Sequence, residues 1–304
     1  MQVRVEELQD VIRRISGQIG YRGLSLVRLS VACRWPVYRG EAPGRKPIFV
    51  KVARPEEVRN TLAILASAGP CMLLPRPILT EPLDFGEYSV LCLEWIDSSI
   101  LFAEKMTDLQ LESFCDGCVA LSKSLSQVTA LLSVKRSDDL ELQYAALVGF
   151  VTRHHLAGIL LRELVEIPTA ERTYGARPMV PIHGDLQPKN YGFDGSRMAA
   201  VYDLEEVRLG LACEDATYAF MERCRHLSGK CHRRLVSLFL KLIELSPWPM
   251  DEWLIAVNHC RLRIASRRLA KHPDGLFVAF DIWRRDRPLR KLYDIIREKV
   301  CVHH

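Results

Sequence analysis

The sequence lacks any long apolar run. No stretch reaches the roughly 18 uncharged apolar residues that identify a membrane-spanning helix, so none is predicted. The opening residues, MQVRVEELQDVIRR, carry charges throughout and contain no apolar core of the kind found in secretory signals. We therefore expect the protein to reside in the cytoplasm.

The sequence also lacks the features of a disulfide scaffold or a zinc site. Its 10 cysteines are spread irregularly over 304 residues, whereas disulfide-rich domains are short and dense in cysteine. The Cys-Asp-Gly-Cys run at 115–118 falls in a helical pattern with no second pair to complete a zinc site. A denser group comprises Cys224, His226, Cys231 and His232. A predicted helix break separates its members, so we expect reduced, packed thiols rather than metal ligands.

The charge is modest overall and uneven along the chain. A formal net charge of +5 does not mark a nucleic-acid-binding protein, and no nucleic-acid partner is predicted. Residues 251–304 nonetheless hold 12 Lys and Arg against 7 Asp and Glu. This excess favours an anionic partner over a cationic one, although a solvated helical face has the same composition. Residues 280–299 have the pattern of an amphipathic basic helix, which could contact a membrane surface or an anionic glycolipid.

The hydrophobic pattern changes from strand-like to helical along the chain. It predicts helices at 3–19 and 55–68, strands at 24–30, 35–38, 47–53, 77–79 and 88–95, then helices over 108–155 and from 215 onward, with a β-rich insert at 179–206. We therefore expect an α+β fold of two lobes with the boundary just after Asp97. Residues 1–97 would form a small β-rich lobe and residues 98–304 a larger, mainly helical lobe.

The sharpest local signal is HGDLQPKN at 183–190, followed by VYDLEE at 201–206. Asn190 lies five residues after Asp185, and Asp203 lies thirteen after Asn190. Phosphoryl transfer needs one carboxylate to orient and deprotonate an attacking hydroxyl, and further oxygen ligands to hold Mg²⁺ against the phosphates. Asp185 suits the first role, while Asn190 and Asp203 suit the second. The alternative is a β-hairpin whose Asp and Asn residues only form turns.

Together these two segments resemble the catalytic and metal-binding loops of the aminoglycoside-phosphotransferase and choline-kinase-like branch of the protein-kinase superfamily. The likeness in the order of elements extends from about Leu24 to Phe220. It implies a protein-kinase-like fold, a nucleotide-binding first lobe, and ATP with Mg²⁺ as cosubstrate and metal. It also implies that Asp185 is the catalytic base and that Asn190 and Asp203 are the metal ligands.

The resemblance also implies where the nucleotide phosphates would bind. Lys51, in the apolar run IFVKVA, takes the place of the lysine that contacts the α- and β-phosphates. A lysine there is costly to bury without an anionic partner. The family places a glutamate of the following helix beside this lysine. Our choice for it is Glu57, and Glu56 is a close competitor.

Further positions follow from the same resemblance. The run EWID at 94–97 ends the last strand of the first lobe and resembles the linker between the lobes, where the backbone of Glu94 and Ile96 would pair with adenine. Asp215 matches an aspartate that braces the catalytic loop from the next helix, and it could equally cap that helix. His183 is expected to be a buried hydrogen-bonding strut rather than an acid or base.

Two features depart from the family pattern. Relatives cover the phosphates with a glycine-bearing turn, but no glycine occurs between Gly23 and Gly40, so the turn at 30–36 is glycine-poor. Relatives also often carry a basic residue two positions after the catalytic aspartate, where this chain has Gln187; Lys189 could supply that charge instead. The first departure leaves open a nucleotide-binding pseudokinase that acts as a scaffold.

The acceptor is expected to be a small molecule. Only eleven residues separate Asp203 from Asp215, and no Ala-Pro-Glu occurs, so the chain lacks the segment with which protein kinases hold a peptide. A small hydroxylated acceptor fits better: a sugar, a lipopolysaccharide-type sugar, an antibiotic or a metabolite. The basic C-terminal stretch favours an anionic acceptor over a polycationic one. A kinase-fold enzyme that modifies a protein is the remaining alternative.

Overall fold

The computed structural model describes residues 5–29, 35–128, 138–169, 177–224, 226–271 and 276–302. Its contacts group into two compact units. The first consists of Met1–Ser98 and Ala199–Glu205, and the second of Ser99–Met198 and Glu206–His304. The short segment Ala199–Glu205 thus makes its contacts with residues far earlier in the chain, and it brings Asp203 into the first unit.

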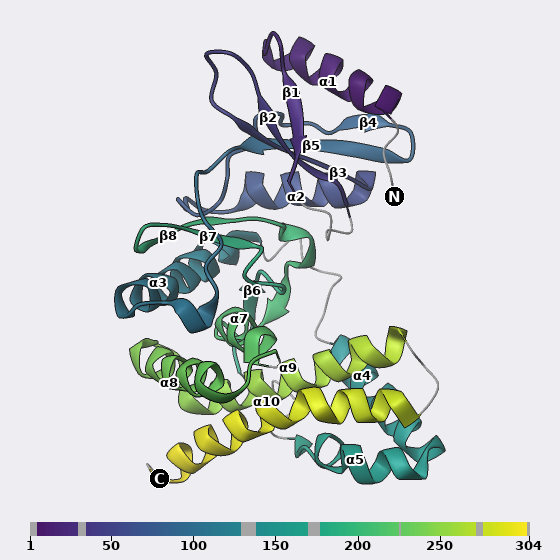
Figure 1. Ribbon diagram of the computed structural model, residues 1–304, viewed down its shortest axis with the longest axis vertical. Helices are drawn as coiled ribbons and strands as arrows, with labels where there is room; N and C mark the ends of the chain where they lie inside the picture. Colours follow the sequence, from purple (N-terminus) through teal and green to yellow (C-terminus); the bar gives the residue numbers. More distant parts are fainter. Residues whose placement is uncertain are drawn as a thin grey trace. The chain divides into compact units, whose positions relative to one another are not determined.

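The first unit is built on an antiparallel sheet of five strands in the order β1-β2-β3-β5-β4. Its strands are β1 (Ser25–Arg28), β2 (Val37–Glu41), β3 (Ile48–Ala53), β4 (Leu83–Phe85) and β5 (Tyr88–Glu94), and its helices are α1 (Val5–Ile19) and α2 (Pro55–Ser67). The two helices lie on opposite faces of the sheet (Figure 1). Strand β3 pairs with both β2 and β5, so Lys51 lies on the central strand.

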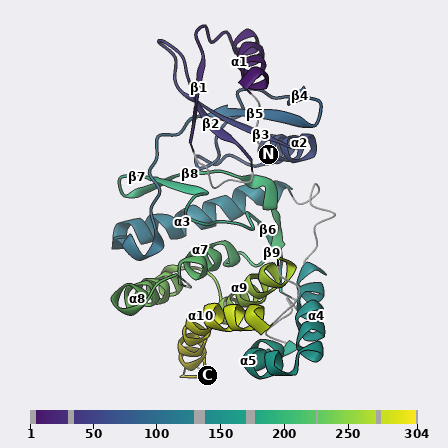
Figure 2. The same cartoon turned by 45° about the vertical axis from the view of Figure 1, so that its right-hand side comes forward.

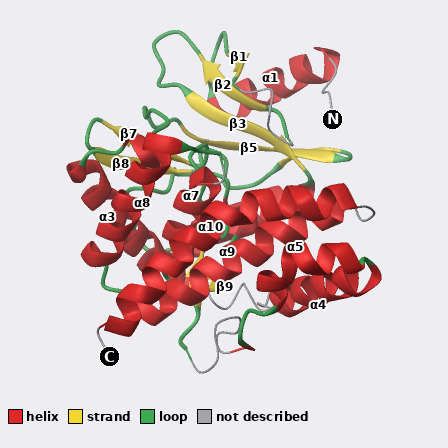
Figure 3. Cartoon of the chain, turned by 60° about the horizontal axis from the view of Figure 1, so that its bottom comes forward, coloured by secondary structure: helices red, strands yellow, loops and turns green. Residues whose placement is uncertain are grey.

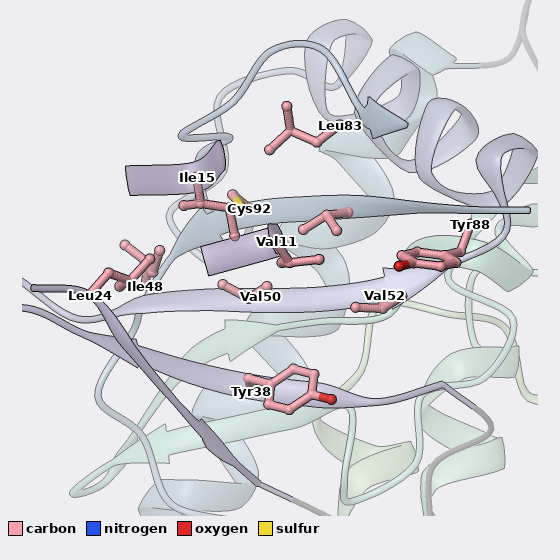
Figure 4. Close-up of a cluster of buried hydrophobic side chains, with 11 residues drawn as sticks. Val11, Ile15, Leu24, Tyr38, Ile48, Val50, Val52, Leu83, Tyr88 and Cys92 are labelled. Carbon is pink, nitrogen blue, oxygen red and sulfur yellow. The ribbon is translucent and has the colours of Figure 1, made fainter. Parts of the chain in front are cut away.

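The alternation of side chains in the sheet separates two cores. The core beneath α1 contains Val11, Ile15, Leu24, Tyr38, Ile48, Val50, Val52, Leu83, Tyr88, Val90 and Cys92 (Figure 4). On the other face, Ala53 packs in a second cluster with Val58 and Leu62 of α2. Successive side chains of a strand point to opposite faces, so Lys51 shares the α2 face with Ala53.

The strand that the sequence predicted at 77–79 is not a strand of this sheet. Residues 77–79 form only an isolated bridge, between Pro77 and Leu93, because a proline lacks the N–H group that a strand ladder uses. The edge strand is instead β4, which has 3 residues and is joined to β5 through Gly86 at a φ of 73°. So short a strand shows too little alternation to be recognised from its pattern.

The second unit is mainly helical. Its helices are α3 (Asp108–Leu125), α4 (Asp138–Arg153), α5 (His155–Val165), α7 (Glu214–Cys224), α8 (Gly229–Leu245), α9 (Met250–Lys271) and α10 (Leu276–Val302), preceded by a short 3-10 helix, η1 (Ala103–Lys105). Two small sheets pair β6 (Val180–Ile182) with β9 (Arg208–Gly210), and β7 (Tyr191–Asp194) with β8 (Arg197–Val201). A second 3-10 turn, η3 (Leu204–Glu206), lies between β8 and β9.

Helix α9 is the centre of this unit. It packs against α4, α7 and α10, and it is buried along most of its length. Figure 2 shows α5 next to α10 and α4 next to α9, and in Figure 3 helices α9 and α10 run side by side. Trp253, near the start of α9, is fully buried with its ring centroid 5.3 Å from that of Phe239 in α8. No helix in the described parts of the chain has the length and apolar character needed to cross a bilayer.

Candidate active site

Lys51 is a buried cation of the first unit. Its side chain is 9% exposed, and its Nζ lies 2.5 Å from Oδ1 of Asp203 and forms a second ion pair with Glu205. Burial lowers the pKa of Lys51, but the two carboxylates raise it by more, so the net pKa is raised and the ammonium group stays charged. The fold thus brings together two residues, Lys51 and Asp203, that the sequence analysis had assigned to phosphate and metal binding.

Asp203 lies just after β8 in a left-handed backbone conformation, with a φ of 69°. Among the described residues other than glycine, no other has a positive φ. Aspartate tolerates this region better than most residues, yet the conformation is costly, and such strain tends to occur at functional sites. The turn allows Asp203 and Glu205 to meet Lys51 from one short segment.

Sequence analysis did not single out Glu205. Burial raises the pKa of Glu205, Lys51 opposes that shift, and the nearby charges of Asp203 and Glu57 add to it, for a net rise. The ion pairs of Lys51 within the described residues go to Asp203 and Glu205, so the pairing of Lys51 with Glu57 stays a prediction. The sequence feature that could have pointed to Glu205 is its position two residues after Asp203.

The predicted linker follows β5 directly. Glu94 is the last residue of β5, and its N–H donates to the carbonyl oxygen of Arg76 over 2.8 Å. The N–H of Ile96 donates to the hydroxyl of Tyr202 over 3.3 Å, and the same hydroxyl donates to the carbonyl oxygen of Ile96 over 3.2 Å. The linker is therefore tied to the residue just before Asp203. The pairing of Glu94 and Ile96 with adenine stays a prediction.

In the second unit, Asp215 of α7 holds the loop that follows β6. Its carboxylate accepts hydrogen bonds from the N–H groups of His183 over 2.7 Å and Gly184 over 2.8 Å. His183 is fully buried, and its Nδ1 accepts a hydrogen bond from the N–H of Asp185 over 3.2 Å. These contacts match the roles expected of Asp215 as a brace and of His183 as a strut.

Asp185 is held by two amide side chains of its own loop. Gln187 donates to Oδ2 of Asp185 over 2.6 Å. Asn190 donates to the same oxygen over 3.3 Å and to the backbone carbonyl oxygen of Asp185 over 2.8 Å. The structure therefore brings the predicted base and one predicted metal ligand into contact. Gln187, which departs from the basic residue common in relatives, serves here to orient the carboxylate.

Two arginines of α9 lie beside this loop, and the sequence analysis gave them no role in the site. Both terminal nitrogens of Arg267 lie 3.5 Å from Oδ1 of Asp185, and one of them donates to the hydroxyl of Tyr218 over 2.5 Å. Arg263 donates to the carbonyl oxygen of Gly184, and its guanidinium lies 5.1 Å from the centre of the Tyr218 ring. Burial and neighbouring arginines lower the pKa of Arg263. The two arginines are four residues apart, so they share one face of the helix.

A buried ionic group supports the start of α7. Glu214 pairs with Arg208 over 2.6 Å, lies 3.2 Å from Nδ1 of His259, and accepts a hydrogen bond from the N–H of Leu211 over 3.0 Å. Burial raises the pKa of Glu214, but Arg208 and His259 lower it by more, so the net pKa lies well below its ordinary value. A small cavity lies between these side chains and Gly184. The carboxylate is therefore a charged support for the helix that carries Asp215.

The model of one protein family, described as the phosphotransferase enzyme family, matches residues 36–244, which is more than half of the chain. The chain belongs to this family. The matched range contains Lys51, Asp185, Asn190 and Asp203. No curated protein sequence matches the chain.

Solved structures of the same fold include phosphotransferases and an antibiotic kinase. An aminoglycoside phosphotransferase from Alicyclobacillus acidocaldarius matches with a TM-score of 0.63 at 10% identity, over 93% of this chain and 95% of that chain. A thermostable mutant of aminoglycoside phosphotransferase APH(4)-Ia, in complex with ADP and hygromycin B, matches with a TM-score of 0.54 at 12% identity, over 92% of this chain and 98% of that chain. Amicoumacin kinase hAmiN, in complex with AMP-PNP, Ca²⁺ and Ami, matches with a TM-score of 0.56 at 11% identity, over 96% of both chains. The predicted protein-kinase-like α+β fold and its aminoglycoside-phosphotransferase branch are confirmed.

Membership of the phosphotransferase family defines the type of reaction. The chain is a phosphotransferase with an alcohol group as acceptor. This prediction is confirmed at that level. The identity of the acceptor, the metal and the roles of single residues remain to be proposed.

Each of the two predicted metal ligands carries an oxygen of the kind that Mg²⁺ binds. Mg²⁺ is usually held by one or two carboxylates together with substrate phosphates. Asp203 supplies a carboxylate, and Asn190 uses its amide nitrogen on Asp185, which leaves its amide oxygen for a metal. Among the residues that the structure describes, no group of three or more His, Cys, Asp or Glu side chains is arranged to hold a metal without such help.

The two cysteines of the group near the end of α7 differ: Cys224 is buried, as expected of a packed thiol, whereas Cys231 is exposed. Sγ of Cys224 lies 3.3 Å from Nε2 of His232, but burial raises the pKa of Cys224 to about 12, so the thiol keeps its proton. The described part of the chain forms no metal site from these residues.

Two further predictions from the sequence, the glycine-poor turn and the basic C-terminal helix, remain predictions. Most of the glycine-poor turn at 30–36 lies outside the described residues, which resume at Trp35. The basic segment 280–299 lies within α10, where Arg285 pairs with Asp281 and Asp286 pairs with Arg261 of α9. Part of the positive charge near the C-terminus is therefore neutralised inside the unit. Contact of this helix with a membrane or a glycolipid stays a prediction.

Proposed function

We propose that the protein transfers the γ-phosphoryl group of ATP, with Mg²⁺, to a hydroxyl of a small anionic molecule, and that Asp185 is the base. The observation that carries this proposal is the way Asp185 is held. Gln187 and Asn190 both donate to Oδ2, whereas Oδ1 lies 3.5 Å from the partly exposed guanidinium of Arg267. A carboxylate held firmly through one oxygen and only loosely contacted at the other is suited to orient a hydroxyl at that second oxygen and to take its proton.

The reaction would proceed by direct transfer. The acceptor oxygen attacks the γ-phosphorus, the bond from that phosphorus to the β–γ bridging oxygen breaks, and ADP leaves. The hydroxyl proton passes to Oδ1 of Asp185. Asp215 and His183 keep the loop backbone in place during this step, since they bind three consecutive N–H groups of the loop. Such positioning supplies much of the catalysis in phosphoryl transfer.

The first unit would hold the nucleotide phosphates and would supply one of the two metal ligands. Lys51 keeps its charge in a buried position and is suited to the α- and β-phosphates. Asp203 and Asn190 would hold Mg²⁺, which neutralises phosphate charge when it is bound. Glu57 and Glu205 would keep Lys51 in position, and the backbone of Glu94 and Ile96 would bind the base.

The arginines of α9 support an anionic acceptor. The side chain of Arg267 is 46% exposed next to Oδ1 of Asp185, and Arg263 forms no ion pair within the described residues. A carboxylate or phosphate on the acceptor would complement both charges, whereas a polycationic aminoglycoside would meet charges of its own sign. A phosphorylated or carboxylated sugar or metabolite is therefore the acceptor class that we propose.

Thermal unfolding tests the nucleotide site. ATP with Mg²⁺ should raise the melting temperature of the wild type, because a ligand at about 100 times its Kd stabilises the folded state by about 2.7 kcal/mol. Asp203→Ala should lose the magnesium-dependent part of that rise. Glu87→Ala, which removes an exposed carboxylate of the same unit, is the matched control and should behave as the wild type. An equal magnesium-dependent rise in all three proteins would exclude Asp203 as a metal ligand.

Release of ADP in the presence of candidate acceptors tests the catalytic loop. Sugar phosphates and hydroxy acids should support turnover better than aminoglycosides do. Asp185→Asn should lower kcat by about 10²- to 10⁴-fold and leave the thermal shift with ATP and Mg²⁺ intact. Undiminished turnover in Asp185→Asn would remove the proposed base, and turnover with polycationic acceptors alone would contradict the proposed acceptor class.

A further inference from the structure

Tyr202 satisfies both polar backbone groups of Ile96 in the linker after β5. Its hydroxyl accepts the N–H of Ile96 over 3.3 Å and donates to the carbonyl oxygen of Ile96 over 3.2 Å. A tyrosine hydroxyl can donate and accept at once, so one side chain serves both groups. The Tyr202 ring stacks on Phe49 of β3, with centroids 5.2 Å apart and planes inclined by 21°. All three residues belong to the first unit.

These are the contacts that a nucleobase would need at this place. A purine offers a flat face for stacking and carries hydrogen-bond donors and acceptors side by side on its edge. The N–H and carbonyl of a single residue are complementary to such an edge. Tyr202 offers the same combination, a flat ring and a group that both donates and accepts, at the linker residue to which the proposed function assigns the base.

The surroundings of Tyr202 allow its side chain to be displaced while its backbone stays in place. Val201, just before it, is buried in β8, and Asp203, just after it, is bound to Lys51. The hydroxyl contacts are longer than the 2.5 to 3.0 Å or so that is common for O–H···O bonds, so they are weak. Displacement therefore requires a side-chain rotation with loss of the stack on Phe49 and of hydrogen bonds to Ile96 and Ser98, rather than a change of the β8 segment.

We propose that Tyr202 takes the nucleobase position when no nucleotide is bound, and that a nucleotide displaces its side chain on binding. The inference rests on the proposed nucleotide site and adds to it a residue that sets nucleotide affinity. The apparent Kd then equals the intrinsic Kd divided by the fraction of molecules in which Tyr202 is displaced. Removal of the hydroxyl raises that fraction, so Tyr202→Phe should bind ATP more tightly than the wild type.

Calorimetric titration of the full chain tests this expectation. The Kd for ATP with Mg²⁺ should fall about 3- to 10-fold in Tyr202→Phe, the effect expected from losing one or two weak hydrogen bonds. Tripolyphosphate with Mg²⁺ has the phosphates but no base, so its Kd should not change. Tyr38→Phe removes a hydroxyl from a buried tyrosine of the same unit and should bind both ligands as the wild type does.

Fluorine NMR of protein labelled with 3-fluorotyrosine reports the displacement itself. The Tyr202 resonance is identified by its absence from Tyr202→Phe; it should move on addition of ATP with Mg²⁺ and stay in place with tripolyphosphate. If the wild type binds ATP while Tyr202→Phe binds it equally or more weakly, or if the resonance does not move, the inference fails and the proposed function stands. If neither protein binds ATP, both fail.

Discussion

At the scale of single residues, the catalytic loop depends on one backbone position that excludes a side chain. Gly184 has a φ of 80°, and a Cβ added there would collide with the backbone carbonyl oxygen of Glu206. The glycine also donates its N–H to Asp215 and accepts a hydrogen bond from Arg263 on its carbonyl. The close approach of the loop to its supports thus requires glycine at the residue before the proposed base.

Replacement of Gly184 by alanine tests this requirement against a matched glycine. Gly195 also has a positive φ, 58°, but an added Cβ there meets nothing within 4 Å. Gly195→Ala should lower the free energy of unfolding by about 1 to 2 kcal/mol, because alanine disfavours the left-handed backbone conformation. Gly184→Ala should cost a further 1 to 3 kcal/mol or so from overpacking and should lose most activity, because the loop must shift. Chemical denaturation and initial rates measure both; equal losses in the two variants would show that the collision is relieved without consequence.

At the scale of elements, α9 links the catalytic loop to the helical core. Arg263 and Arg267 lie at the loop, and His259 lies at Glu214. Between them in the sequence, Arg261 is 3% exposed and forms a two-point ion pair with Asp286 of α10, at 2.8 Å for both contacts. Helix α9 therefore holds its arginines at the loop only while it stays in register with α10.

Breaking this buried ion pair should destabilise the helical unit. Asp286→Ala leaves the Arg261 charge buried without its partner, which typically costs about 3 to 5 kcal/mol. The control is Glu166→Ala just after α5, which breaks an exposed pair with Arg162 four residues away and should change stability by less than about 0.5 kcal/mol. Urea denaturation measures both variants. A loss in Asp286→Ala no larger than that of the control would mean that the pair does not hold α9 to α10.

At the scale of the whole molecule, the sequence predicted those parts of the site that depend on short segments. Asp185 and Asn190 lie five residues apart in one loop, and Lys51 is recognisable because a charge interrupts an apolar strand. The contribution of Arg267 was not predictable, since it approaches Asp185 from 82 positions away on a helix with many other arginines. The contacts of Tyr202 were equally hidden, because they depend on the rotamer of a side chain rather than on a pattern.

The acid stability of the molecule should depend on Glu214, which is fully buried and has a lowered pKa. A carboxyl group with a lower pKa in the folded than in the unfolded state stabilises the fold above its unfolded pKa of about 4.3, and this contribution is lost as the pH falls. Asp215, the neighbouring carboxyl, has its pKa raised by burial, so its contribution has the opposite sign. Only a comparison with a variant of Glu214 separates the two effects.

Glu214→Gln provides that comparison, because glutamine can still accept the N–H of Leu211 but no longer forms the ion pair with Arg208. We expect the variant to be less stable than the wild type by about 3 to 5 kcal/mol at pH 7, the cost of leaving buried charges unpaired. The difference should shrink as the pH falls below about 4.3, since Glu214 then takes up a proton in the unfolded wild type while the folded protein still holds it ionised. Guanidinium unfolding at pH 7, 5 and 3 measures the difference. A gap that stays constant over this range would mean that the folded protein does not lower the pKa of Glu214, and that the start of α7 is held by its hydrogen bonds alone.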